Sequence, residues 1–181
     1  YKEGEILDNG PLRFTVKLEF NPMNVKGDTT IVEARVITLD AGSHLNRTTI
    51  TYNNLQESLP IVTGIVLHDT IGAIVADAKG GYMTYVDPTT GPGQGQIFVG
   101  AAFPEDVNEA KPVRFSDEER RRRNNAYGHV LSYSEYEPND EYVYYWGFAW
   151  DQADIQTAEA WDEYMKAFAK KVRNPLEVRL K

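Results

Sequence analysis

The stretch Val143-Tyr144-Tyr145-Trp146-Gly147-Phe148-Ala149-Trp150 determines how the rest of the sequence is interpreted. Successive side chains of a β-strand point to opposite faces, so this segment puts its largest rings on one face. These rings belong to Tyr144, Trp146, Phe148 and Trp150. Gly147 and Ala149 narrow the other face and let a neighbouring layer approach closely. Such a row of rings either stacks on sugar rings or fills the middle of a sandwich, and both uses stay open at this point.

The composition is that of an acidic chain of 181 residues, long enough for one well-buried core. Its formal net charge of −8 gives no general attraction to nucleic acid or to anionic membrane surfaces. No apolar run reaches the roughly 18 residues that cross a bilayer. The absence of cysteine excludes disulfides and thiolate metal sites. We therefore expect no nucleic-acid partner, no membrane partner, no metal and no cofactor.

Three N-terminal segments predict an antiparallel meander: Arg13 to Phe20, Thr29 to Leu39, and Leu45 to Asn53. Each alternates apolar with polar side chains, so we expect an apolar face on the core, with Phe14, Val16, Leu18 and Phe20 from the first strand. The opposite face is expected to gather Arg13, Lys17, Glu33, Arg35, Arg47, Thr49 and Thr51. Such a polar face is either solvated and held by cross-strand pairs, or curved into a groove for hydroxyl- and carboxylate-bearing ligands.

Further strands are predicted over Glu5–Leu7, Ile61–His68, Ile71–Ala76, Tyr82–Val86, Gln96–Ala102 and Tyr127–Tyr136. Ser116, followed by three acids and then four arginines, predicts a short exposed helix. Thr157 predicts the start of a longer amphipathic helix that Asn174-Pro175 ends. On that helix, Trp161, Tyr164, Met165 and Phe168 recur at spacings of three and four and are expected to be buried. A closing strand is predicted over Leu176–Leu180.

The sequence thus predicts a mainly β fold, an antiparallel β-sandwich with one C-terminal amphipathic helix. Residues 1–181 are expected to form a single domain, either complete or the C-terminal part of a larger one.

Two motifs that suggest phosphate or nucleic-acid binding lack the context that such binding needs. Gly91-Pro92-Gly93-Gln94-Gly95 is followed by a strand-like segment rather than a helix, which favours a simple hairpin loop. The arginines at 120–123 follow three acids directly and are not interleaved with aromatic residues. A solvated helix face is therefore favoured over a nucleic-acid site.

The three histidines, His44, His68 and His129, lie far apart in the sequence and form no pair with metal-ligand spacing. Each is either a structural residue or an acid/base group that titrates near neutral pH. Our catalytic candidates are His44, His129 and Asp40, because Asp40 precedes His44 in a predicted turn and His129 opens a predicted strand. The ligand-binding candidates are Arg13, Arg35, Arg47, Tyr144, Trp146 and Trp150.

Four stretches together resemble a known family: Ile6–Arg13, Ile37–Asn46, Tyr144–Trp150 and Asn174–Val178. The resemblance is to uncharacterised secreted proteins of gut and marine Bacteroidetes, encoded in polysaccharide-utilisation gene clusters. It implies a galactose-mutarotase-like supersandwich, the fold shared by sugar epimerases, polysaccharide lyases and domains of glycoside hydrolases. Members of that family are about twice this long, and the chain resembles their C-terminal part. No catalytic residues carry over from it.

The first functional hypothesis is a carbohydrate-active or carbohydrate-binding domain, periplasmic or secreted, whose partner is an oligosaccharide or polysaccharide. If it is an enzyme, its chemistry is expected to resemble that of a polysaccharide lyase, a glycoside hydrolase or a mutarotase. The acid/base group would then be one of the three histidines. The second hypothesis is a non-catalytic assembly domain whose aromatic face packs on a second chain or on a missing N-terminal segment. Tryptophans that line an open surface favour the first hypothesis, and buried tryptophans favour the second.

Overall fold

The structure is a computed structural model, and it describes residues 1–88, 91 and 93–176. The chain divides into two compact units. The first comprises Tyr1–Ile61 and Ser134–Gly147, and the second comprises Val62–Tyr133 and the chain from Phe148 onward. Strands hold 52% of the residues, and every strand pair with a described register is antiparallel. The predicted mainly β, antiparallel sandwich-type fold with a C-terminal amphipathic helix is confirmed.

The first unit is built on one antiparallel sheet in the order β1-β2-β4-β5-β12. Its strands are β1 (Glu3–Asn9), β2 (Arg13–Glu19), β4 (Asp28–Asp40), β5 (Leu45–Asn53) and the first part of β12 (Tyr142–Trp150). A short strand, β3 (Met23–Val25), pairs with the start of β4. The predicted meander is therefore present, with β1 added at one end of the strand order.

The predicted polar face of this meander is wrong, because the strand registers divide its residues between the two faces. Lys17 lies opposite Val36, and Val36 lies opposite Thr49, so these side chains share a face. Leu18 lies opposite Arg35, which lies opposite Ile50 on the other face. Each strand alternates as predicted, but β4 is offset by one residue from the predicted alignment, and such an offset moves every side chain to the opposite face.

The predicted apolar face is also less buried than expected. Phe14, Val16, Leu18 and Phe20 are at best half-buried, and all of β1 is exposed. Since β2 lies beside the terminal strand β1, its side chains are far from the centre of the sheet. Many of the buried residues of the first unit lie instead on β4 and β5, and they include Ile31, Ala34, Leu45, Thr48 and Ile50.

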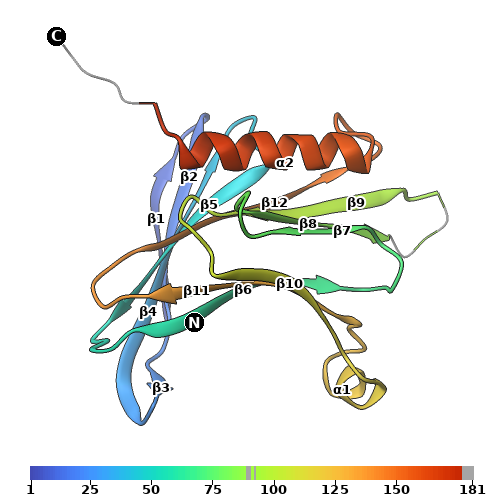
Figure 1. The fold of residues 1–181 in the computed structure, drawn as a ribbon. Coiled ribbons are helices and arrows are strands. Elements are labelled where there is room, and N and C mark those ends of the chain that lie inside the picture. The colour runs from blue at the N-terminus through green and yellow to red at the C-terminus, as the bar shows by residue number, and fades with distance from the viewer. Residues whose placement is uncertain (89–90, 92, 177–181) are drawn as a thin grey trace. The chain divides into compact units, whose positions relative to one another are not determined.

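In the second unit, the strand β8 (Tyr82–Pro88) and its neighbours lie between a helix and a second sheet (Figure 1). The strands β7 (Ile74–Asp77), β8 and β9 (Gln96–Ala102) pair in that order. The helix α2 (Ala158–Arg173) covers β8 and β9 on one side. A second sheet has the order β10-β11-β6, and its strands are β10 (Glu109–Arg114), β11 (Gly128–Tyr136) and β6 (Leu59–Leu67). The parts of these strands that belong to the second unit, Glu109–Arg114, Gly128–Tyr133 and Val62–Leu67, lie on the other side of β8 from α2 (Figure 1). Tyr82–Val86 are consequently all buried.

Both predicted helices form with the predicted caps. Thr157 accepts a hydrogen bond from the Ala160 backbone N–H at 3.2 Å, and Asn174 ends α2. The short helix α1 (Asp117–Arg122) begins with a reciprocal capping box between Ser116 and Glu119 and buries none of its residues. The predicted closing strand over Leu176–Leu180 lies, beyond Leu176, outside the described residues.

The buried line of α2 differs slightly from the predicted stripe. Trp161, Met165 and Ala169 are fully buried, whereas Tyr164 and Phe168 are half-buried beside them. A Cβ atom at Gly100 of β9 would come within 2.8 Å of Met165 Cε. The helix therefore rests directly on a glycine of the sheet.

Two strands were not predicted, β3 and β10. β10 stands at one end of its sheet, three of its six residues are charged, and it contains Pro112. Proline is tolerated on edge strands because its missing N–H interrupts no inner ladder. The sequence did not predict this edge strand because its composition is polar.

The seat of α2 on the sheet can be tested by removing a side chain that lies over Gly100. We expect Met165→Ala to lower the free energy of unfolding by about 2–5 kcal/mol, because it empties a fully buried site. Phe168→Ala is the matched control and should cost less, because the Phe168 side chain is half-buried. Urea unfolding of both variants measures the difference. An unchanged midpoint for Met165→Ala, or a larger loss for Phe168→Ala, would contradict this packing.

Candidate functional site

The aromatic strand β12 exposes its rings. Gly147 and Ala149 are buried, whereas Trp146, Phe148 and Trp150 are exposed. The alternative in which these rings fill a sandwich core therefore does not hold for these three residues. The third tryptophan, Trp161 of α2, is the buried one.

Gly147 lets β12 lie against the start of β5. A Cβ atom at this position would come 1.9 Å from the carbonyl oxygen of His44, a distance that no side chain tolerates. The ladder between β12 and β5 runs from Tyr142 opposite Ile50 to Gly147 opposite Leu45. The small face predicted for this strand thus accommodates the backbone of a neighbouring strand.

Trp146 is held at its polar edge, and its ring is left partly open. The indole N–H donates to Thr48 Oγ1 at 2.8 Å, and Thr48 is fully buried. The Asn46 side-chain amide donates to the Trp146 carbonyl at 3.3 Å. The residue remains 41% exposed. A ring fixed in this way loses little conformational freedom when a ligand stacks on it.

A half-buried ion pair lies on the same face of the sheet. The Arg35 guanidinium donates to the carboxylate of Glu33, which is itself buried. The guanidinium carbon also lies 5.2 Å from the centre of the Phe20 ring, in cation–π geometry. Arg35 therefore has its charge neutralised locally, while part of its side chain remains accessible.

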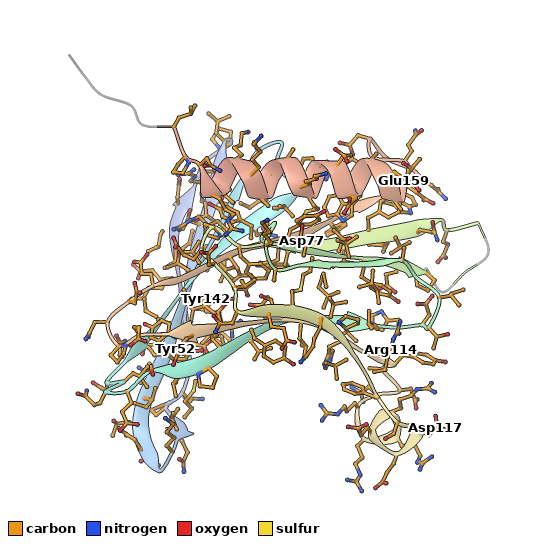
Figure 2. The ribbon with its side chains drawn as sticks, in the orientation of Figure 1. Tyr52, Asp77, Arg114, Asp117, Tyr142 and Glu159 are labelled. Atoms are coloured by element: carbon orange, nitrogen blue, oxygen red, sulfur yellow. The ribbon has the colours of Figure 1, made fainter. Side chains whose placement is uncertain are left out.

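Two tyrosines surround this pair and remain neutral. Burial, followed by the negative charge of Glu33 and a hydrogen bond to it, raises the pKa of Tyr52 well above its ordinary value. Burial also raises the pKa of Tyr144, against opposing contributions from Arg35 and from a hydrogen bond with Thr48. Tyr52 and Tyr142 project from neighbouring strands and are labelled in Figure 2. Because their pKa values are raised, Tyr52 and Tyr144 keep protonated hydroxyls that can donate and accept hydrogen bonds.

We call this surface the aromatic face. It lies wholly in the first unit, and the strand registers place its members on one side of the sheet. It consists of Glu33, Arg35, Tyr52, Tyr144 and Trp146. Three of the predicted ligand-binding residues, Arg35, Tyr144 and Trp146, are therefore brought together.

Arg13 and Arg47 lie on the opposite face of the sheet. Arg13 holds Asp40 with two hydrogen bonds, Nε to Oδ1 at 2.5 Å and Nη2 to Oδ2 at 2.9 Å. The hydrogen bond from Arg13 lowers the pKa of Asp40. Arg47 donates to Thr49 Oγ1 at 2.7 Å. Both oxygens of Asp40 are thus engaged by an arginine, which makes this carboxylate a weak candidate for a catalytic base.

The two histidines among the catalytic candidates lie in different units. His44 belongs to the turn before β5 in the first unit, and His129 lies on β11 in the second. The His129 ring meets Phe115 edge to face with 4.9 Å between ring centres. Burial, and to a smaller extent the charge of Arg123, lowers the pKa of His129. A neutral imidazole against an aromatic ring suits a structural histidine at least as well as a catalytic one.

His68 lies in contact with a carboxylate; it was named among the possible acid/base groups but left out of the candidate set. Its Nδ1 lies 2.8 Å from Asp87 Oδ2. The two residues are 19 positions apart and come from the end of β6 and the end of β8. Spacing in the sequence does not predict such a pair, because only the fold brings these strand ends together.

Trp150 lies in the second unit, where it fixes the connection between β8 and β9. Its indole N–H donates to the Gln94 carbonyl at 2.8 Å, and the Gln152 amide donates to the Gly93 carbonyl at 2.9 Å. The predicted hairpin is confirmed, since β8 and β9 pair antiparallel around this connection. Thr89, Thr90 and Pro92 of the same loop lie outside the described residues.

Within the described ranges, no three histidine, aspartate or glutamate side chains are grouped so that they could hold a metal ion. No helix in the described part of the chain is both long and apolar enough to cross a membrane.

These features define a mainly antiparallel β protein with an exposed, partly polar aromatic face on one sheet. The chain belongs to the family described as "Domain of unknown function (DUF4861)", whose model matches residues 1–178. It is similar to "Uncharacterized protein P7" of Formosa agariphila, a member of the Bacteroidetes, at 25% identity over 181 residues. That match covers 99% of this chain and 42% of the relative, so the chain spans less than half of the relative's length.

The lowered pKa of His129 predicts a dependence of stability on pH. The unfolded chain takes up a proton near the ordinary value of 6.5, whereas folded His129 takes it up only at lower pH. The unfolded state therefore binds more protons in this window, and stability falls as pH drops below about 6.5. We expect His129→Gln to remove that part of the slope, measured as urea midpoints between about pH 5 and 7. His44→Gln is the control. The same slope in wild type and His129→Gln would contradict the assignment.

Proposed function

We propose that this chain is a carbohydrate-binding domain of a larger protein that acts on polysaccharides, and that the aromatic face holds the sugar. The observation that carries the proposal is the Trp146 ring, fixed at its nitrogen by Thr48 and open on its surface. Rings presented in this way stack on the C–H surface of a pyranose. The arrangement therefore supplies the flat apolar contact that a sugar site needs.

The groups beside Trp146 supply the polar half of such a site. Arg35 donates from a rigid planar fork, and Tyr144 and Tyr52 carry neutral hydroxyls. Sugar hydroxyls require donors and acceptors of this kind at fixed positions. Because Glu33 already neutralises Arg35, and the chain carries a net charge of −8, this face favours neutral sugars over polyanions.

The finer expectations from the family resemblance belong to the same proposal. We place the chain in the galactose-mutarotase-like supersandwich set and in the periplasm or outside the cell, within polysaccharide utilisation. The mainly antiparallel fold and the similarity to a Bacteroidetes protein support this placement. Since the relative is more than twice as long, the catalytic activity of the whole protein, whether lyase-, hydrolase- or mutarotase-like, is part of the proposal.

Sugar binding on the aromatic face predicts a tryptophan fluorescence response that depends on Trp146. In a Trp150→Phe background, which keeps a ring at position 150, a panel of neutral and uronate-containing oligosaccharides should change the emission. Trp146→Ala should weaken binding about tenfold or more, because the variant loses both the apolar area that the ring buries against the sugar and the about 0.5–1.5 kcal/mol that stacking adds to it. Isothermal titration of the same variants measures the affinity independently of fluorescence.

Arginine variants on the two faces provide the matched control. Arg35→Ala should weaken binding, whereas Arg47→Ala on the opposite face should leave it unchanged. Circular dichroism and the urea midpoint must show that each variant folds. No response across the panel, or equal losses in both arginine variants, would reject the aromatic face as the sugar site.

The second candidate function is assembly, and a specific apolar patch favours it. Ile6 lies opposite Val16, and Phe14 lies opposite Leu39, on the same side of the sheet as the aromatic face. Ile6, Phe14 and Leu39 are 61%, 38% and 42% exposed. β1 stands at one end of the strand order, where a sheet can accept another strand. A contiguous apolar surface beside a strand edge is typical of a docking surface.

Assembly through this patch predicts self-association or capture of a further segment of a longer protein. Under this alternative the chain sediments as a dimer at tens of micromolar, and Ile6→Lys with Phe14→Ser returns it to a monomer. Lys17→Glu, on the opposite face of β2, is the control and should leave the dimer intact. A monomer at that concentration, which also does not bind the remainder of a longer homologue, would reject the assembly function.

A further inference from the structure

We propose that His68 and Asp87 form an acid–base dyad that, together with Arg114, removes the proton next to the carboxylate of a uronic acid residue. The inference rests on the proposed carbohydrate function and names a second site, with its substrate class, in the other unit. Its residues all belong to the second unit, so the site is defined without reference to the aromatic face.

The geometry of the dyad leaves the reactive nitrogen free. His68 Nδ1 and Asp87 Oδ2 are 2.8 Å apart. The His68 side chain is 59% exposed and that of Asp87 only 17%. No described residue bonds Nε2 of His68. When the carboxylate accepts the Nδ1 proton, Nε2 carries the lone pair and faces solvent, which is the arrangement of a general base.

Asp87 has few other partners. Its second oxygen, Oδ1, is buried and has no hydrogen-bond donor among the described residues. A buried carboxylate oxygen without a donor is costly, and such groups tend to mark functional sites. A purely structural contact between the segment after β6 and the end of β8 would gain more from a fully hydrogen-bonded carboxylate. The arrangement therefore favours a carboxylate whose task is to orient the imidazole.

Hydrogen bonds to the Tyr85 hydroxyl hold the backbone at His68 in place. The Tyr85 hydroxyl accepts hydrogen bonds from the backbone N–H groups of His68 at 3.1 Å and Asp69 at 3.2 Å. It donates to Asp69 Oδ1 at 2.9 Å. Tyr85 is fully buried, and burial raises its pKa far above the ordinary value. Tyr85 and Asp87 are two residues apart on β8, so they point to the same face and hold consecutive residues of one turn.

Arg114 supplies the positive charge beside the dyad. Its Nη1 donates to the Asp69 carbonyl at 2.9 Å, which attaches the guanidinium to the residue after His68 (Arg114 is labelled in Figure 2). It forms no ion pair with any carboxylate in the described part of the chain. In a chain with 27 acidic and 19 basic residues, an exposed arginine without a carboxylate partner is available for an external one. A guanidinium fork matches the two oxygens of a uronate.

The reaction step follows from these three groups. The C–H bond next to the uronate carboxylate, at C5 of the sugar, breaks, and its proton moves to His68 Nε2. The electron pair of that bond moves toward the carboxyl group to give an enediolate, whose growing negative charge Arg114 stabilises. Return of a proton from the imidazolium to C5 restores a uronic acid. Atoms and charge balance without any further reactant.

Solvent exchange measures this step directly. In D2O, oligosaccharides of galacturonate, glucuronate and mannuronate incubated with the protein should lose the C5–H signal in proton NMR. We expect His68→Gln to slow the exchange about a hundredfold or more, which is the usual contribution of a general base. Asp87→Asn should slow it about a hundredfold through misplacement of the ring. Arg114→Lys should retain part of the rate, and Arg114→Met should abolish it.

Two readouts separate this proposal from a structural role and from the sugar-binding proposal. Imidazole nitrogen shifts should show the tautomer with the proton on Nδ1 for His68, and Asp87→Asn should lose it while the fold and the Tyr85 contacts persist. Trp146→Ala should abolish sugar stacking on the first unit without removing this tautomer.

Several outcomes would overturn the dyad. These are no C5 exchange with any uronate under conditions in which the aromatic face binds sugar, and full exchange in folded His68→Gln. Loss of exchange in His129→Gln but not in His68→Gln would assign the chemistry to another histidine. A proton on Nε2 of His68 in the wild-type protein would remove the proposed base.

Discussion

The position of β4 between β2 and β5 determines the chemistry of the first unit. β4 forms backbone ladders with both neighbours over the same residues, Ala34–Thr38, so its alignment is fixed from two sides. Side chains in register across three strands form rows on each face. Leu18, Arg35 and Ile50 are one such row, and Lys17, Val36 and Thr49 are the row on the opposite face. A slip of one residue would exchange the two rows and take Arg35 away from Tyr144 and Trp146.

The features that the sequence predicted correctly are local. The capped helices and the alternation of each strand, including the division of β12 into a face of large rings and a face of small residues, depend on residues within a few positions of one another, and hydrophobic periodicity reports them well. The features that it did not predict depend on alignment between segments. Glu33 and Arg35 alternate with Val32, Ala34 and Val36 in a way that fits either face, since the pattern of one strand contains no information about its register. The pairing of His68 with Asp87 was out of reach for the same reason. β10 was missed because an edge strand needs no apolar face.

The exposure of Trp146 is informative because large apolar surfaces are costly in water. Burying a large aromatic side chain contributes about 1.5–3 kcal/mol or more, and this residue gives up a substantial part of that gain. Its indole nitrogen is satisfied by Thr48, so hydrogen bonding to solvent does not explain the exposure. We propose that a ligand or a partner covers the ring. Sugar binding is favoured on the aromatic face because a neutralised arginine and two neutral tyrosines adjoin the ring, whereas the aliphatic patch of Ile6, Phe14 and Leu39 offers a partner chain no such donors.

The two proposed sites have different chemical requirements, and the chain meets each with a different arrangement of charge. On the aromatic face the charge of Arg35 is cancelled by buried Glu33, which lowers the cost of desolvation when a neutral sugar covers it. Beside His68, Arg114 forms no ion pair with a carboxylate among the described residues, and its Nη1 donates to the Asp69 carbonyl. An arginine paired with a carboxylate contributes hydrogen bonds. An arginine without such a pair also contributes electrostatic stabilisation of a nearby negative charge. Proton removal next to a carboxylate needs this electrostatic stabilisation, because negative charge grows on a group that is already anionic. A sugar that is only bound needs no such stabilisation, and for this reason we propose binding on the first surface and proton transfer at the second.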